Sequence, residues 1–233
     1  MFLTALKRLI PNRSMSTRIL SGPFRGAAIC MNPRDNLRKI LGLYEHELND
    51  WLSRVLQRVD IVLDVGANDG YFTFGCAAVF RRLGRVANIV AFEPQPDHCK
   101  QLQASLGDQP KHCVKIAIEQ TLVGRTIGPG VTTLDAVTLR NFGSQAPDDF
   151  PRKALIKIDV EGAELDVIEG ASGWLRPKHY FLIEVHRETY LTTLKRRFAD
   201  AGIALEQRNQ QPLPFLGRER RMEANWWLVS RLD

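Results

Sequence analysis

Short apolar runs alternate with helix-like patterns along most of the chain. Runs rich in Ile, Val, Leu and Phe, with little polar alternation, lie at residues 61–65, 88–93, 113–118, 154–160 and 180–185. Strands of this composition are covered on both faces, which is typical of a parallel sheet. Apolar residues at three- and four-residue spacing predict helices over 71–83, 96–106, 162–171 and 189–201. The pattern therefore predicts an α/β protein built from βαβ units.

The C-terminal part departs from this alternation. Residues 203–208 and 225–230 have the composition of two further strands, and no helix fits in the Pro-, Gly- and Arg-rich stretch between them. Neighbouring strands joined without a crossover helix are antiparallel. We therefore predict a hairpin that adds an antiparallel edge to a mostly parallel sheet.

The first 58 residues carry a different pattern. Leu3, Leu6 and Ile10 have helical spacing before Pro11, which predicts a short amphipathic helix or a frayed arm. Apolar positions over residues 35–56 predict an amphipathic helical segment bent at Gly42. We divide the chain into a basic N-terminal arm with a helical flank or lid, residues 1–58, and a main domain, residues 59–233.

Charge also separates these two parts. The 233 residues have a net charge of +6, and residues 1–58 hold ten Lys and Arg against four Asp and Glu, so the whole excess lies there. The segment lacks the basic motif with interleaved aromatic residues that nucleic-acid modules show. We expect a solvated basic face, no nucleic-acid partner, and at most weak peripheral contact with a membrane.

Composition indicates the compartment. No stretch approaches the roughly 20 apolar residues that a membrane-spanning helix needs. The four cysteines form no CxxC pair and no disulfide-framework spacing. We expect a cytoplasmic globular protein.

Charged residues end four of the predicted strands. In chain order these strand ends carry Asp64, then Glu93, then Asp159 with Glu161, and finally Glu184 with His186. In open α/β sheets, ligands bind outside the carboxyl ends of the strands. The sequence therefore predicts one site, rich in carboxylates, at this edge of the sheet.

The loop after the first strand suits a nucleoside with positive charge. Gly66, Asn68 and Gly70 form this loop, but the third glycine of a dinucleotide fingerprint is absent. Glu93 stands where a carboxylate accepts the ribose hydroxyls, and Asp64 favours a cationic amino group over a phosphate. These features describe S-adenosylmethionine, and we assign all five residues to its binding.

Several stretches resemble the FkbM family of S-adenosylmethionine-dependent methyltransferases. They are LDVGANDGYFTFG, AFEPQP, TLDAV, LIKIDVEGAELDVIEGA and FLIEVH, spread over about residues 60–186. The resemblance implies a Rossmann-like class I methyltransferase fold, with a seven-stranded sheet whose last strand is antiparallel. It also implies O-methylation of a hydroxyl on a sugar, a glycan or a polyketide-like molecule. The stretch before TLDAV is shorter than is usual in the family. The adenine contact usually follows the third strand, so it falls to Glu119 or Gln120, and we assign Glu119.

Three residues are candidates for the chemistry. His186 is the leading general base for a hydroxyl acceptor, and Glu184, on the same face of its strand, could orient the imidazole. Asp159 lies beside the cofactor pocket, and we assign it to cofactor binding as well. It pairs with Lys157, or else Asp159 or Glu161 contacts the acceptor. An alternative has Asp159, Glu184 and His186 hold a divalent metal, but we assign no metal.

Other functions remain open on the sequence alone. N-methylation of an amine or a protein is the runner-up within the same chemistry. An NAD-dependent oxidoreductase and a catalytically silent adaptor with the cofactor fold are alternatives of another class. The missing third glycine and Asp64 argue against the oxidoreductase, and the intact Asp64, Glu93 and His186 argue against the adaptor.

Overall fold

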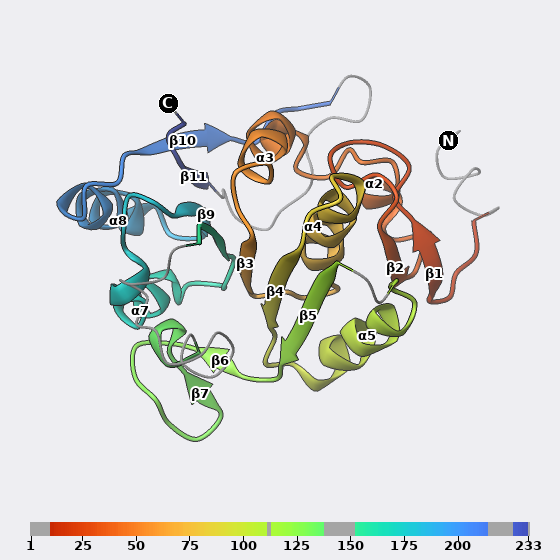
Figure 1. The fold of residues 1–233 in the computed structure, drawn as a ribbon, viewed down its shortest axis with the longest axis horizontal. Coiled ribbons are helices and arrows are strands. Elements are labelled where there is room, and N and C mark those ends of the chain that lie inside the picture. The colour runs from red at the N-terminus through yellow and green to blue at the C-terminus, as the bar shows by residue number, and fades with distance from the viewer. Residues whose placement is uncertain (1–9, 111–112, 138–151, 214–225, 233) are drawn as a thin grey trace.

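A seven-stranded sheet forms the centre of the molecule (Figure 1). The computed structural model describes residues 10–110, 113–137, 152–213 and 226–232. The strand order is β10-β11-β9-β8-β3-β4-β5. The strands are β3 (Ile61–Val65), β4 (Ala87–Phe92), β5 (Val114–Glu119), β8 (Ala154–Ile158), β9 (Tyr180–Val185), β10 (Leu205–Asn209) and β11 (Trp226–Ser230). The first five pair in parallel, so the predicted Rossmann-like class I methyltransferase sheet is confirmed.

The predicted C-terminal hairpin is present and forms one edge of the sheet. β11 pairs antiparallel with both β9 and β10, so β10 is the edge strand. The predicted antiparallel edge and the antiparallel last strand are both confirmed; the sequence left open which strand of the hairpin is the outer one. Apolarity explains the observed order: Trp227, Leu228 and Val229 are buried, while β10 has the polar sequence LEQRN. An interior position pairs both edges of β11 and buries this more apolar strand, whereas the polar β10 takes the exposed edge.

Helices cover both faces of the sheet. On one face of the sheet, Val62 and Leu155 pack in a hydrophobic cluster with residues of α3 (Asn49–Val55) and α4 (Tyr71–Arg82). Leu102 of α5 (Pro96–Gly107) belongs to the same cluster. The neighbouring residues in the same strands point to the opposite face, where they pack in a second cluster with α7 (Glu164–Glu169) and α8 (Glu188–Asp200). The 3₁₀ turn η2 (Ser172–Trp174) belongs to this second face. Because successive side chains of a strand point to opposite faces, the position of a residue in its strand decides which helices it packs against.

The N-terminal segment contains a hairpin that the sequence pattern did not predict. β1 (Met15–Arg18) and β2 (Ala28–Met31) are antiparallel, and β2 lies against α4 and α5 (Figure 1). Phe24, in the turn, packs so closely on α4 that a Cβ on Gly75 would lie 2.3 Å from its ring. The segment thus shares the core of the α4 face. Its separation from the main domain at residue 58 stays a prediction.

The predicted helical segment over residues 35–56 is interrupted. It consists of α2 (Leu37–Ile40), the 3₁₀ turn η1 (His46–Leu48) and α3. Gly42 has a φ of 67° and Glu45 a φ of 49°, so the chain leaves the helical conformation twice. The helix predicted from Leu3 to Ile10 falls almost entirely on residues 1–9, outside the described residues.

Smaller features complete the fold. β6 (Leu122–Val123) and β7 (Val131–Thr132) form a short parallel pair that was not predicted. Among the described residues, no helix has the length and apolar character to cross a membrane. Cys30, Cys76, Cys99 and Cys113 all carry free thiols, so none forms a disulfide.

Candidate active site

A cavity of about 450 Å³ opens at the carboxyl ends of the central strands. It lies where the chain order reverses, since β4 follows on one side of β3 and β8 lies on the other. Six residues predicted from the sequence line it: Gly66, Asn68, Glu93, Asp159, Glu184 and His186. Asp64, Gly70 and Glu119 are not among its lining residues.

The glycine loop is fixed by close backbone contacts. Gly66 has a φ of 80°, and a Cβ there would lie 1.9 Å from the carbonyl oxygen of Asp159, so only glycine fits. The backbone N–H groups of Gly66 and Ala67 both donate to the carbonyl of Phe92 at 3.0 Å. Gly70, with a φ of 85°, supports the start of α4, where a Cβ would collide with Phe74. Gly66 therefore shapes the cavity, whereas Gly70 holds the helix behind it.

The Glu93 carboxylate is held by backbone donors at the end of β4. Its Oε2 accepts from the N–H of Asn68 at 2.8 Å, and its Oε1 from the N–H of Gln95 at 2.9 Å. Asn68 adopts a left-handed conformation, with a φ of 48°, that allows this contact. Each carboxylate oxygen has a second lone pair. Glu93 can therefore accept further hydrogen bonds from hydroxyls in the cavity.

Asp64 lies beneath the cavity rather than on its wall. Its register partner across the sheet is Lys157, and both side chains lie on the face covered by α4. The hydroxyl of Thr73 donates to Asp64 Oδ2 at 2.5 Å, and the Lys157 ammonium lies 3.4 Å from Oδ1. Burial raises the pKa of the Asp64 carboxyl, although Lys157 and Thr73 oppose this. The prediction that Asp64 touches the cofactor directly is at odds with this position.

Lys157 links three parts of the strand ends. Its ammonium pairs with Asp159 Oδ2 at 3.0 Å and donates to the carbonyl of Gly66 at 3.2 Å. Burial lowers the pKa of Lys157, but the charges of Asp159 and Asp64 outweigh it and raise the pKa well above its usual value. Lys157 therefore stays charged, and the predicted ion pair with Asp159 exists. The ion pair involves only the Oδ2 atom of Asp159.

His186 is oriented by Glu164, not by Glu184 as predicted. Its Nδ1 lies 2.7 Å from Glu164 Oε1, and its backbone N–H donates to the same oxygen at 3.2 Å. Glu164 is fully buried at the start of α7. Burial lowers the pKa of the His186 imidazole, but its hydrogen bond with Glu164 and the charges of Asp159, Glu164 and Glu161 prevail and raise it. The surroundings thus favour the positively charged form of the imidazole.

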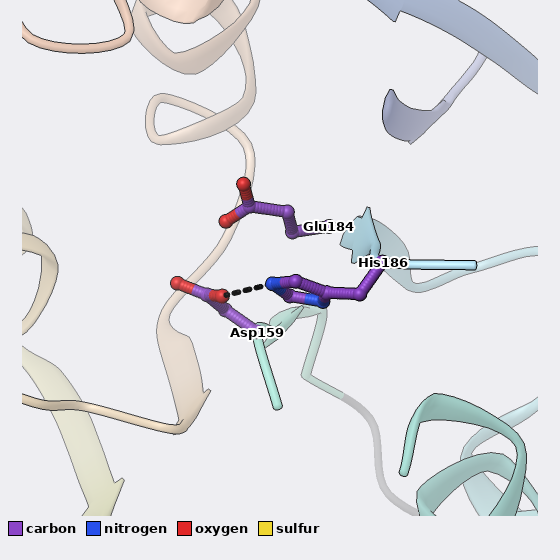
Figure 2. Close-up of side chains that lie close together, drawn as sticks. All are labelled: Asp159, Glu184 and His186. Atoms are coloured by element: carbon purple, nitrogen blue, oxygen red, sulfur yellow. Dashed lines mark ion pairs between the residues drawn. The ribbon is translucent and has the colours of Figure 1, made fainter. Parts of the chain in front are cut away.

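Asp159, Glu184 and His186 converge at one end of the cavity (Figure 2). Asp159 directly follows β8, Glu184 lies in β9, and His186 directly follows β9. One ligand atom from each lies within 4.8 Å of the others. His186 Nε2 is 3.9 Å from Asp159 Oδ1 (Figure 2). Figure 2 shows the three side chains directed toward one another.

Two parts of the wall were missed by the sequence analysis. Thr121, Leu122 and Val123 line the cavity and Glu119 does not, so the assignment of Glu119 to the adenine stays a prediction that the cavity lining does not support. The chain turns away from β5 at Glu119 and returns to the cavity through β6. Tyr44, between α2 and η1, lines the cavity from the N-terminal segment. Neither contribution carries a sequence signal, because both depend on tertiary contacts.

Comparison with known protein families gives a match over part of the chain. Residues 109–193 match the family model described as "Methyltransferase FkbM domain". This part of the chain is therefore similar to an FkbM methyltransferase domain. The matched range includes Asp159, Glu164, Glu184 and His186, whereas the glycine loop and Glu93 precede it. The match therefore covers the residues that supply the charged end of the cavity.

Relatives and solved structures agree with this assignment. "Hexuronic acid methyltransferase AglP" of Haloferax volcanii is 24% identical over 161 residues, covering 63% of this chain and 64% of the relative. The crystal structure of methyltransferase FkbM from Methylobacillus flagellatus has a TM-score of 0.55 at 18% identity, covering 84% of this chain and 59% of that one. The putative methyltransferase yhhF from Escherichia coli has a TM-score of 0.50 at 15% identity, covering 93% and 98%. The chain spans about three fifths of the length of the first two proteins. The structural likenesses support the fold.

Proposed function

We propose that this protein transfers a methyl group from S-adenosylmethionine to a hydroxyl of a sugar or glycan. One observation carries the proposal: a single cavity joins Gly66, Asn68 and Glu93 at one end with Asp159, Glu184 and His186 at the other. Methyl transfer requires donor and acceptor to be aligned within one enclosed site. The first group suits the donor and the second the acceptor.

The residues present fit the methyl donor. The left-handed Gly66 keeps the loop free of a side chain where a nucleoside would approach, and Glu93 offers carboxylate oxygens for ribose hydroxyls. When bound, S-adenosylmethionine supplies an electrophilic methyl group on a positively charged sulfur. The carboxylates of Glu93, Asp159, Glu161 and Glu184 line the same cavity and complement that charge.

The acceptor end supports a hydroxyl acceptor. An alcohol is a weak nucleophile at neutral pH and needs a group that removes its proton, whereas a neutral amine does not. Asp159, Glu184 and His186 supply titratable groups at this position. The relative from Haloferax volcanii is named a hexuronic acid methyltransferase, which supports a sugar as the acceptor class.

Two measurements on the purified full chain test the proposal. Calorimetric titration with S-adenosylhomocysteine should give saturable binding, and titration with NAD should give none. Release of S-adenosylhomocysteine from S-adenosylmethionine is then followed with hexuronate-containing glycans and nucleotide sugars, and with a matched panel of amines. Binding of NAD alone would refute the donor assignment. Turnover with amines alone would refute the hydroxyl acceptor.

A further inference from the structure

Three metal-ligating side chains meet at the acceptor end of the cavity. Asp159, Glu184 and His186 each place one ligand atom within 4.8 Å of the others (Figure 2). Two oxygen ligands of one Mg²⁺ or Ca²⁺ ion lie at most about twice the metal–oxygen distance apart, roughly 4–5 Å. The 3.9 Å between His186 Nε2 and Asp159 Oδ1 is too long for a direct hydrogen bond. The three ligand atoms are therefore spaced closely enough to coordinate one metal ion.

Groups outside the cluster orient two of these ligands. Glu164 engages His186 Nδ1 at 2.7 Å, so that Nε2 faces Asp159. A buried carboxylate on the far nitrogen is the usual partner of a metal-ligating histidine. Lys157 holds Asp159 through Oδ2, so that Oδ1 faces His186. The cluster is therefore arranged in advance by Glu164 and Lys157, which lie beneath or behind it.

The third ligand lies on a rigid element. Glu184 is 3% exposed and belongs to β9, which is paired with β8 on one side and β11 on the other. Asp159, with 27% of its side chain exposed, opens the cluster to the cavity. Three protein ligands on one side leave coordination positions on the cavity side for water or an acceptor oxygen.

We propose that Asp159, Glu184 and His186 bind one divalent cation of the Mg²⁺ or Mn²⁺ class, which activates the acceptor hydroxyl. Two carboxylate ligands favour such hard cations, and Mn²⁺ also accepts an imidazole nitrogen. This inference rests on the proposed function above. It assigns His186 as a ligand and replaces its role as a free base, because an Nε2 lone pair bound to a metal cannot accept a proton.

The cation would act on the acceptor oxygen. Coordination lowers the pKa of the hydroxyl, and its proton passes to solvent water at the open side of the cavity. An electron pair of that oxygen forms the new bond to the methyl carbon. The carbon–sulfur bond breaks and its electron pair stays on sulfur. The products are a methyl ether and neutral S-adenosylhomocysteine, with one proton released.

Direct metal binding is the first test. The full chain is dialysed against EDTA and then freed of chelator, and Mn²⁺ is titrated in while free Mn²⁺ is followed by electron paramagnetic resonance. We expect one site, weakened at least about tenfold by Glu184→Gln and by His186→Asn. Glu188→Gln, on the exposed start of α8, is the matched control and should bind like the wild type. Titration with S-adenosylhomocysteine checks that each variant keeps its fold and its donor site.

The outcomes separate this inference from the proposed function. Methyl transfer that EDTA abolishes and Mn²⁺ restores supports both. Transfer that is unchanged by exhaustive EDTA treatment overturns the cation and leaves the proposed function standing. Mn²⁺ binding that neither Glu184→Gln nor His186→Asn weakens also overturns the site. Failure of S-adenosylhomocysteine to bind, with Mn²⁺ binding intact and sensitive to both variants, overturns the proposed function alone.

Discussion

The two ends of the cavity are built by different means. The donor end depends on backbone geometry: left-handed Gly66, and N–H groups of Asn68 and Gln95 that hold Glu93. The acceptor end depends on side-chain charge: Lys157 holds Asp159 and Glu164 holds His186. At the donor end, replacement of Gly66 should disrupt the site, whereas exchange of neighbouring side chains should be tolerated. At the acceptor end, replacement of the charged side chains should disrupt the site. The two ends should therefore respond differently to substitution.

Gly66→Ala should have the largest effect, because it attacks the backbone of the donor end. The new Cβ would lie 1.9 Å from the Asp159 carbonyl oxygen in a left-handed conformation. We expect a loss of roughly 4 kcal/mol or more in the free energy of unfolding, measured by urea denaturation. Gly84→Ala is the control, since Gly84 also has a positive φ but has no atom within 4 Å of its added Cβ. Equal losses in the two variants would contradict the steric argument.

His186→Ala should separate the acceptor end from the donor end. We expect turnover with a hydroxyl acceptor to fall about 10²-fold or more, because the hydroxyl loses its activation. The dissociation constant of S-adenosylhomocysteine should change by less than about threefold, because Glu93 at the donor end is unchanged. For scale, a tenfold change would correspond to about 1.4 kcal/mol. His46→Ala, outside the cavity lining, serves as control. A parallel loss of donor binding would show that the two ends are not independent.

His179 provides a reference outside both ends. It is buried, accepts a hydrogen bond from the N–H of Ala154 on Nδ1, and burial together with Lys178 and Arg176 lowers its pKa to about 3. The native state therefore excludes a proton that the unfolded chain binds below its pKa of about 6.5. Stability is full above that pH and falls as the pH drops toward 3, by about 1.4 kcal/mol per unit.

The measurement is urea denaturation of the wild type and of His179→Asn between pH 7 and pH 5. We expect the wild type to lose up to about 2 kcal/mol over this range. The variant, which cannot titrate at this position, should lose less. Identical slopes would remove His179 as the cause.

Glu93→Gln should have the smallest effect, confined to donor affinity. The amide keeps one oxygen for the backbone donors but loses the charge, so S-adenosylhomocysteine should bind about tenfold more weakly. Glu119→Gln is the matched control, because Glu119 ends the neighbouring strand but does not line the cavity. Calorimetric titration measures both variants. A larger effect at Glu119 would restore the original adenine assignment.

The sequence was sufficient for the elements whose signal is local. Apolar runs predicted β3 and β9 with their observed bounds, and the charged residues at or just after their ends predicted which strand ends carry charge. It was insufficient where register or packing decides. The pairing of Asp64 with Lys157 depends on how β3 and β8 align, and the choice of Glu164 over Glu184 depends on where α7 begins. The β1–β2 hairpin has only four residues in each strand, too few for a periodic pattern.

The interior position of β11 sets an order of assembly. Trp227 lies opposite Glu184 in the sheet, and Val229 lies opposite Leu182. During synthesis, β9 leaves the ribosome about 40 residues before the strand that covers its second edge. Until then that edge has unpaired N–H and C=O groups and can pair with other chains. Completion of the sheet next to Glu184 therefore comes late, and a nascent chain paused between these strands would be a target for chaperones.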